Sequence, residues 1–387
     1  MLKEGIILNT IGIICEYNPL HTGHKKQIDL LRGEDSAIVC LMSGNFVQRG
    51  HPAIIDKSVR AEAAIRCGAD LVLELPAVYA LSSAEGFAAG GVKILSGFCD
   101  KLCFGAETAD KDILVNTAKA LLSDELPPLL RSHLEQGKSF PAARQAALEE
   151  MGLDATLLES PNNILAVEYC KAILSQNSAM EPMPIHRGGD YHDPLAQLEN
   201  PSATSIRGLM MEHRYWKSYV PGECVALFEN ARLHHISAGE RAILARLRTM
   251  SDEAFEALPY GSEGLWRKFM HACRSCATLD EIIEETKSKR YTRTRIDRMI
   301  MCACLGLTAE DLNAPVPYVR VLALNDRGRT ILKKAREHGI FLNAGDIENC
   351  AYGQKEQQMG DLYGLFALEG PEKPGIEANR RIYYHKG

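Results

Sequence analysis

Short apolar runs alternate with helical segments over the first part of the chain, from Ile11 to about Val115. A regular alternation of strand and helix predicts an α/β fold with a doubly wound parallel sheet. The first two runs have no polar face, which is typical of parallel strands that helices cover on both sides. The four predicted strands are Ile11–Cys15, Ala37–Met42, Asp70–Leu75 and Asp100–Gly105.

The alternation stops near residue 200, and 387 residues exceed what one hydrophobic core usually supports. Nearly every segment from Gly222 to Leu312 has helical periodicity, whereas a strand at Tyr318–Asn325 and a helix at Gly328–Glu337 resume the first pattern. Ser205 is expected to cap a helix that begins at residue 206. We therefore predict an α/β domain over residues 11–200, a helical domain over 201–313 and a small C-terminal α/β unit over 314–387.

The composition excludes several classes of protein. Apolar residues make up 46% and charged residues 24%, so the chain is expected to fold throughout. A net charge of -6 excludes a uniformly basic nucleic-acid binder, so any RNA contact must come from a local basic patch. No apolar run reaches the length of a membrane span.

Twelve cysteines occur without a secretory signal, which favours a reducing cytoplasm in which they act as small core residues. Cys273 and Cys276 have the spacing of metal ligands, and His271, Cys302 and Cys304 lie near them in sequence. Because these segments are predicted to be helical and no second such pair follows, we favour core packing and expect no metal site.

The sequence His21-Thr-Gly-His24 lies where the first predicted strand turns into a helix. Ligands bind at this edge of such sheets, and the start of a helix offers unpaired N–H groups and a positive dipole end. Pro19 limits the turn, and Gly23 lets a phosphate approach the backbone. The two imidazoles can point to one side and stabilise charge on an α-phosphate as pyrophosphate leaves. Two structural histidines at a turn are the alternative.

Two further segments open onto the same edge of the predicted sheet. The segment Met42–Gly50 has the composition of a loop that closes over a ligand, through Ser43, Gly44, Gln48 and Arg49. Next come Asp56, Lys57 and Arg60, where a cation at a helix start can reach a phosphate or a small carboxylate. An ordinary solvated helix start is the alternative for both cations.

Later positions at this edge suit a nucleotide. Gly105 ends the fourth predicted strand and allows close approach by a base or ribose. Asn162 and Asn163 precede a helix, so they either cap that helix or bind the nucleotide.

A basic cluster lies in the predicted helical domain, with Tyr291 as a possible stacking surface. Such a cluster on an acidic chain favours binding of a phosphate backbone. A solvated helix face, offset by Glu281, Glu284 and Glu285, is the alternative. The predicted RNA-binding cations are Lys287, Lys289, Arg290, Arg293, Arg295 and Arg298.

Six ordered motifs together resemble the bacterial tRNA(Met) cytidine acetate ligase family. They are EYNPLHTGH at Glu16–His24, MSGNFVQRG at Met42–Gly50, ELP at Glu74–Pro76, FGAE at Phe104–Glu107, SPNNILAVEY at Ser160–Tyr169 and SATSIR at Ser202–Arg207. The resemblance runs from about Ile11 to the C-terminal region. It implies a Rossmann-like HxGH nucleotidyltransferase fold for the first domain. The chain departs from the family pattern at Leu20, where phenylalanine is common, and in the ten residues that precede its first predicted strand.

The resemblance also implies an activity. Members use ATP and acetate to form acetyl-adenylate, and transfer the acetyl group to N4 of the wobble cytidine, C34, of elongator tRNA(Met). His21 and His24 would organise the phosphates, Lys57 would hold the acetate, and Mg²⁺ would accompany ATP. The implied ATP site consists of Ile13, Ile14, Cys15, Glu16, Tyr17, Asn18, Pro19, Leu20, His21, Thr22, Gly23, His24, Lys25, Lys26, Gly105, Asn162 or Asn163, His186 and Arg187.

Two other interpretations remain open at this point. A small-molecule nucleotidyltransferase, which makes a dinucleotide cofactor or a CDP-activated alcohol, uses the same HxGH chemistry. It would need neither the basic cluster nor the helical domain. A non-catalytic RNA-binding protein with a nucleotide-sensing pocket is the second interpretation, and the two histidines argue against it.

Overall fold

The computed structural model describes residues 9–138, 140–187, 202–335 and 350–386. The sequence RGGDYHDP at 187–194 is expected to form a loop after a strand at Met183–His186, and residues 188–194 of it lie outside these ranges. So do the last two residues of the helix expected to end at Glu337.

Seven strands form one sheet in the order β7-β6-β1-β2-β5-β8-β9. The pairs β1·β6, β6·β7 and β8·β9 are parallel, whereas β5·β8 is antiparallel. The predicted α/β fold with a mainly parallel sheet is confirmed. The strands are β1 Asn9–Cys15, β2 Ser36–Ser43, β5 Leu71–Leu75, β6 Lys101–Ala106, β7 Glu181–His186, β8 Val321–Asn325 and β9 Tyr383–His385.

The chain divides into two compact units, and the boundary passes through β1 and β2. Unit 1 comprises residues 1–14, 33–39 and 83–191, and unit 2 comprises residues 15–32, 40–82 and 192–387. The division predicted from sequence, at residues 200 and 313, stays a prediction.

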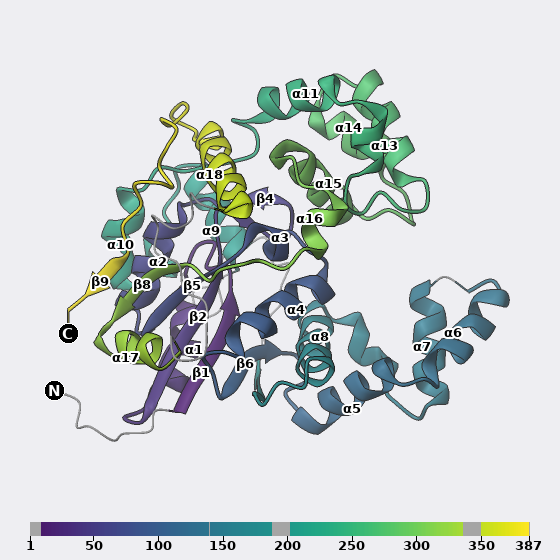
Figure 1. The fold of residues 1–387 in the computed structure, drawn as a ribbon, viewed down its shortest axis with the longest axis horizontal. Coiled ribbons are helices and arrows are strands. Elements are labelled where there is room, and N and C mark those ends of the chain that lie inside the picture. The colour runs from purple at the N-terminus through teal and green to yellow at the C-terminus, as the bar shows by residue number, and fades with distance from the viewer. Residues whose placement is uncertain (1–8, 139, 188–201, 336–349, 387) are drawn as a thin grey trace. The chain divides into compact units, whose positions relative to one another are not determined.

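In unit 1, helix α4 (Ala84–Leu95) packs closely on β1. A methyl group on Gly91 would lie 2.4 Å from Ile14 Cδ1, so glycine permits this approach. Helix α8 (Pro161–Ser175) lies against α4 and α5 (Lys111–Leu122). Two further helices, α6 (Leu126–Glu135) and α7 (Phe140–Glu150), pack on each other beside the short helix η1 (Ala155–Glu159) (Figure 1).

In unit 2, α2 packs on β8, on β9 and on α10. Ser202, and not Ser205 as expected, caps α9, because its hydroxyl oxygen accepts a hydrogen bond from the Ser205 N–H at 3.0 Å. The elements here are α1 Thr22–Leu31, β3 Phe46–Val47, β4 His51–Pro52, α2 Lys57–Arg66, α3 Ala77–Ala80, α9 Ala203–Met211, η2 Lys217–Tyr219, α10 Gly222–Glu229 and α17 Asp326–Ala335.

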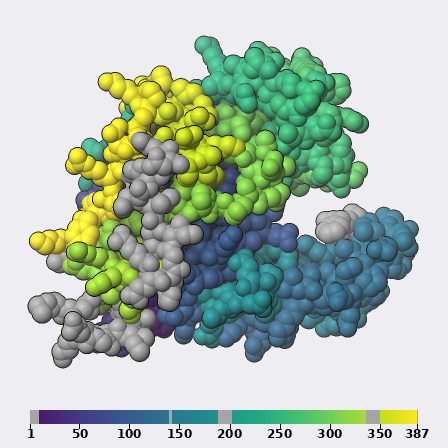
Figure 2. All heavy atoms as spheres, in the orientation of Figure 1, coloured from purple at the N-terminus to yellow at the C-terminus, as the bar shows by residue number. Residues whose placement is uncertain are grey.

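The segment from residue 222 to residue 312 is helical as predicted, and α11, α13, α14 and α15 pack together within unit 2 (Figure 1). Figure 2 shows the atoms of this bundle, coloured teal to green, as one continuous mass. Phe255, Phe269 and Ile300 are fully buried in its core. The helices are α11 Glu240–Thr249, α12 Asp252–Glu256, α13 Leu265–Ser275, α14 Leu279–Thr286, α15 Arg293–Leu305 and α16 Ala309–Asn313, followed by α18 Ala351–Tyr363 and η4 Gly364–Phe366.

Cys273 and Cys302 lie inside this helical core, where burial raises the pKa of each thiol to about 12. Among the described residues, no group of three or more His, Cys, Asp or Glu side chains is arranged to hold a metal ion. None of the helices in the described ranges is both long enough and apolar enough to cross a membrane.

Candidate active site

The turn that leaves β1 is fixed by bonds from two other segments of unit 2. Ile54 N–H donates to Asn18 Oδ1 at 2.8 Å, and Arg207 Nη1 donates to the Asn18 carbonyl oxygen at 2.7 Å. Tyr17 has a left-handed backbone (φ 44°) and a buried side chain. Its ring lies 5.0 Å from that of His24. The turn therefore delivers the HTGH sequence in one defined position.

His21 and His24 are stacked at the start of α1, with ring centroids 3.7 Å apart and planes inclined by 23°. Gly23 N–H donates to His21 Nδ1 at 3.1 Å, and His21 N–H donates to His24 Nδ1 at 3.3 Å. An Nδ1 that accepts a hydrogen bond carries no proton, so each neutral ring must carry its proton on Nε2. Both imidazoles are thereby prepared as Nε2–H donors.

The start of α1 also favours an anion electrostatically. Its first turn contains no acidic side chain, whereas the first turns of α4 and α5 contain Glu85 and Asp112. The positive end of the α1 dipole is thus not neutralised by a carboxylate of its own first turn, and it suits a phosphate.

The segment Met42–Gly50 contains the end of β2, then β3 and the turn that leads to β4, and other segments hold it in place. β3 pairs with β4, and Gln48 N–H donates to Glu16 Oε1 at 2.8 Å. Gly50 has φ +80°, and a Cβ there would lie 2.6 Å from the Asp297 carbonyl oxygen. Ser43 is buried and Gly44 directly contacts Glu74, while Gln48 and Arg49 are half-buried. The predicted closure of Ser43, Gly44, Gln48 and Arg49 over a ligand stays a prediction.

Lys57 lies in a buried network of charges. Its Nζ is 2.6 Å from Glu74 and 3.0 Å from Glu377, and only 4% of the residue is exposed. Burial opposes ionisation of Glu377, but Lys57, Arg380 and Arg320 outweigh it and lower its pKa to about 2. A substrate carboxylate would therefore compete with two resident carboxylates for Lys57, and its acetate-binding role stays a prediction. The sequence motif ELP contains Glu74, but its spacing does not reveal this partnership.

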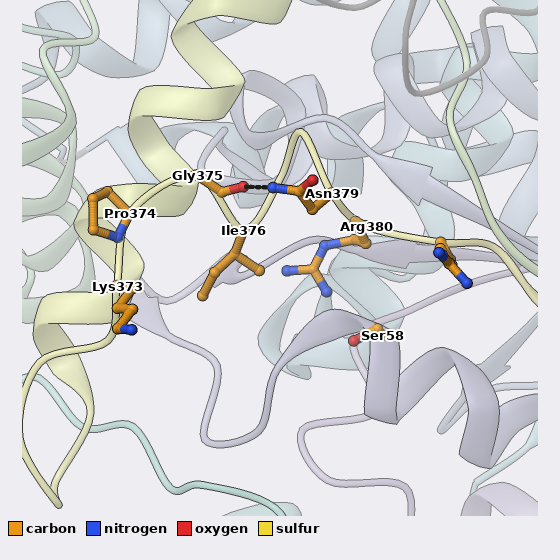
Figure 3. A pocket seen from close by; sticks show the side chains of 8 residues that line it. Ser58, Lys373, Pro374, Gly375, Ile376, Asn379 and Arg380 are labelled. Carbon is orange, nitrogen blue, oxygen red and sulfur yellow. Dashed lines mark hydrogen bonds between the residues drawn. The ribbon is translucent and has the colours of Figure 1, made fainter.

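A hollow lies beside this network, at the C-terminal segment that carries Glu377 (Figure 3). Asn379 Nδ2 donates to the Gly375 carbonyl oxygen at 3.1 Å, which closes the turn at its rim. None of the predicted nucleotide-binding residues is among those that line it. The lining residues are Ser58, Lys373, Pro374, Gly375, Ile376, Asn379, Arg380 and Arg381.

In unit 1, Glu107 organises the second group of predicted ligands. Its carboxylate accepts from Asn162 Nδ2 at 2.7 Å and from Asn163 N–H at 2.9 Å. His186 Nδ1 donates to its carbonyl oxygen at 3.1 Å. The Arg187 side chain lies over Gly105, since a Cβ on that glycine would be 3.3 Å from Arg187 Cδ.

The two asparagines differ in what their side chains do. Asn163 is 3% exposed and uses both amide atoms on Thr108, accepting from its N–H at 2.9 Å and donating to its Oγ1 at 3.3 Å. Asn162 is half-buried, and its Oδ1 accepts from Arg187 Nη1 at 3.4 Å. Asn163 is therefore the more deeply buried of the two, so we favour Asn162 as the nucleotide contact, and the choice between them stays a prediction.

The predicted ATP-binding residues gather in two groups, one within each unit. Unit 2 contains Cys15 to Lys26, and unit 1 contains Ile13, Ile14, Gly105, Asn162, Asn163, His186 and Arg187.

The six predicted RNA-binding cations are of two kinds. Arg295 donates through Nε and Nη2 to the Tyr260 carbonyl oxygen, at 3.0 and 2.8 Å, and the Arg298 guanidinium lies 4.9 Å from the Tyr260 ring centroid. Arg295 thus holds the backbone before α13, and Arg298 packs on the Tyr260 ring. The other four have exposed side chains, and they are Lys287, Lys289, Arg290 and Arg293.

Paired histidines at the start of a helix, following the first strand of a mainly parallel sheet, define a protein of the HxGH nucleotidyltransferase class. The family model described as HIGH Nucleotidyl Transferase matches residues 8–367. The tRNA(Met) cytidine acetate ligase of Clostridium novyi is 38% identical over 352 residues, which is 85% of this chain and 88% of that protein. That of Clostridium acetobutylicum is 36% identical over 355 residues, again 85% and 88% of the two chains.

Solved structures show the same similarity. Apo Thermotoga maritima TmcAL is 28% identical, covers 98% of this chain and 100% of its own, and has a TM-score of 0.90. TmcAL bound with alpha-thio ATP has a TM-score of 0.88 with the same coverage. The chain therefore belongs to the tRNA(Met) cytidine acetate ligase family, as its motifs indicated.

Proposed function

We propose that this protein is an ATP-dependent ligase that acetylates N4 of C34 in elongator tRNA(Met). The observation that carries the proposal is the 38% identity over 85% of the chain to a protein named tRNA(Met) cytidine acetate ligase. A TmcAL structure with bound alpha-thio ATP supports ATP as the nucleotide. A cytoplasmic location belongs to the same proposal, because the chain contains no disulfide among its twelve cysteines and tRNA is modified in that compartment.

In the proposed first step, an acetate oxygen attacks the α-phosphorus of ATP, and the bond from that phosphorus to the pyrophosphate oxygen breaks. Acetyl-adenylate and pyrophosphate result. The Nε2–H groups of His21 and His24 donate to the phosphate oxygens as charge accumulates, and the start of α1 supports the same charge. The protein supplies no nucleophile, since the substrate carboxylate attacks.

In unit 1, we assign nucleotide contacts to Asn162, to Arg187 and to Gly105, which the Arg187 side chain overlies, with Asn163 as their support. We propose that Mg²⁺ enters as the ATP complex. This fits the absence, within the described ranges, of a cluster of three protein ligands for a metal, because Mg²⁺ is commonly held by phosphates and water.

In the second step, the N4 amine of the cytidine attacks the acetyl carbon, the bond from that carbon to the AMP oxygen breaks, and the amine loses a proton. AMP and acetylated tRNA leave. The exposed cations Lys287, Lys289, Arg290 and Arg293 are proposed to contact the RNA backbone.

A direct test incubates the protein with ATP, labelled acetate and a transcript of elongator tRNA(Met). We expect acetate-dependent pyrophosphate release and label in the RNA, located at C34 by nuclease digestion and mass spectrometry. A C34U transcript is the control, because it lacks the accepting amine. Pyrophosphate release that ignores acetate, or ATP binding without turnover, would contradict the proposal. The Lys57→Arg variant tests the acetate role of Lys57, which predicts a raised KM for acetate.

A further inference from the structure

Arg60, on α2, is the largest fully buried side chain in the described part of the protein, at 0% exposure. Its guanidinium donates to four backbone carbonyl oxygens. Nε donates to Ile55 at 2.8 Å, Nη1 donates to Glu16 at 2.6 Å and to Ser43 at 3.1 Å, and Nη2 donates to Gly44. One side chain thus holds three separate segments of unit 2.

The segments that Arg60 joins are those that leave the strands at the candidate site. Glu16 begins the turn that carries His21, and Ser43 and Gly44 begin the β-hairpin segment. A second tie joins the same two segments, since Gln48 N–H donates to Glu16 Oε1 at 2.8 Å. The relative position of the two loops therefore depends on the Arg60 guanidinium and on the Glu16 carboxylate.

Burial of the Arg60 cation costs free energy, which suggests that the residue has a functional role. Burying a cation is unfavourable unless it is fully hydrogen-bonded, and no ion pair among the described residues includes Arg60. Four carbonyl dipoles stabilise the charge, and the Asp56 and Glu16 carboxylates add to this from farther away. A planar, rigid fork of donors fixes several oxygens at once, which a lysine ammonium cannot do. A cation beneath these loops also favours anions above them.

We propose that Arg60 is a positioning residue for adenylylation, which sets the His21 and His24 imidazoles against the Ser43–Gly44 backbone without touching the substrate. The inference rests on the proposed function for the step concerned. Reacting groups must be placed closely, and an error of about 1 Å can cost about 100-fold in rate.

The test compares Arg60→Lys with Arg60→Met and with Arg66→Met, a control on the same helix whose side chain is 39% exposed. We expect Arg60→Lys to lower kcat of acetate-dependent ATP–pyrophosphate exchange about 10- to 100-fold, with KM for ATP changed less than about threefold. Arg66→Met should stay within about twofold of wild type. An Arg60→Lys enzyme whose kcat, corrected for the folded fraction from thermal melting, equals that of wild type would overturn the proposal.

A second measurement does not depend on turnover. Nitrogen-15 NMR of labelled histidines reports the tautomers of His21 and His24, assigned with a variant of each. Wild type should show the Nε2–H form for both rings, and Arg60→Lys should shift these signals toward a tautomer mixture. Unchanged signals overturn the positioning role. Failure of wild type to exchange pyrophosphate rejects the proposed function alone, because the NMR comparison still tests Arg60.

Discussion

Each histidine of the HTGH sequence accepts a backbone hydrogen bond with Nδ1, and we propose that its Nε2–H donates to the phosphates of ATP. Nδ1 of His21 and Nδ1 of His24 accept from backbone N–H groups at 3.1 and 3.3 Å. The HxGH spacing therefore matters for two reasons, because residues three apart can cap the helix reciprocally and stack their rings.

Because the two ring nitrogens have different roles, we expect different outcomes for two substitutions at His24. Asparagine can replace the Nδ1 acceptor but lacks the Nε2 donor, whereas the longer glutamine can place an N–H near the Nε2 position. We expect His24→Asn to lower kcat for pyrophosphate exchange about 100- to 1,000-fold, and His24→Gln to retain clearly more activity. Thermal melting should change little in His24→Asn. Equal loss in both variants would mean that the Nε2–H is not the important group.

Asn162 and Asn163 are expected to separate function from stability. Asn162→Ala should weaken ATP binding about tenfold, measured by calorimetry, with little change in unfolding. Asn163→Ala leaves buried Thr108 groups without a partner, so it should lower the free energy of unfolding by about 1–3 kcal/mol. The reverse pattern would assign the nucleotide contact to Asn163.

At the level of elements, α15 and the segment before it combine two uses of positive charge. Arg295 and Arg298 hold Tyr260, while the four exposed cations reach solvent. Of these, Arg290 lies 3.1 Å from Glu263 and Arg293 lies 3.4 Å from Asp297, so part of their charge is offset within the protein.

We expect alanine at Lys289 or Arg290 to weaken tRNA binding and to reduce the slope of log K against log salt by about one per cation. Lys93→Ala, an exposed lysine on α4, is the matched control. Filter binding at several salt concentrations measures both quantities. Arg295→Ala should instead lower the melting temperature, because it releases the Tyr260 backbone. A salt slope that is unchanged in every variant would remove this surface from the RNA interface.

Much of the fold followed from periodicity, because buried parallel strands and amphipathic helices have local signatures. The strands β1, β2, β5 and β6 lie within a few residues of their predicted bounds, and α2 and α8 begin within a few residues of the expected helix starts. The β3·β4 hairpin did not follow from the sequence, since a glycine-rich segment looks like a loop unless its ties to Glu16 and Asp297 are known. The cap of α9 was placed three residues late for a related reason, because Ser202 and Ser205 are both plausible caps.

The candidate site could be located from sequence, but not its electrostatics. HTGH and the asparagine pair are local motifs, so the neighbouring sequence is enough to recognise them as candidate site residues. Lys57 looked like a free cation at a helix start, yet its partner Glu377 lies 320 residues away in sequence. Arg60 likewise looked like a cation on a solvated helix start, because the backbone oxygens that it binds lie in other segments of the chain. Pairings across such distances depend on the complete fold.

At the scale of the whole molecule, the last residues of the chain complete a buried charge network in unit 2. Arg380 binds Asp56 and lies 3.0 Å from Glu377, and Arg320 lies 3.7 Å from Glu74. β8 adds to the sheet antiparallel to β5 and brings Arg320 to Glu74. The C-terminal segment thereby fixes the start of α2, which carries Lys57 and Arg60.

This network contains the carboxyl groups of Asp56, Glu74, Glu356 and Glu377 and the cations Lys57, Arg320 and Arg380. Burial and the charge of nearby Glu74 disfavour the ionised form of Glu356. Burial and then Glu74 raise the pKa of Glu356 from 4.5 to about 7, although Lys57 and the Tyr318 hydroxyl oppose this shift. Between about pH 4.5 and pH 7, Glu356 is protonated in the folded protein but ionised in the unfolded chain. The stability due to this group is present below about pH 4.5 and is lost as the pH rises to about 7, by about 3 kcal/mol in all.

Glu356→Gln, which cannot ionise, should therefore flatten part of the pH dependence of the free energy of unfolding. Urea titrations at pH 5 and pH 8 measure it, and we expect the variant to gain stability over wild type between these two values, by up to about 3 kcal/mol. Glu256→Gln, an exposed glutamate on α12, is the control and should track wild type at both pH values. If wild type and Glu356→Gln differ by the same amount at pH 5 and pH 8, the Glu356 carboxyl does not exchange a proton in this range, and all four carboxylates are ionised against three cations. Arg60, which interacts electrostatically with Asp56, would then be the fourth cation that balances the charge of these carboxylates.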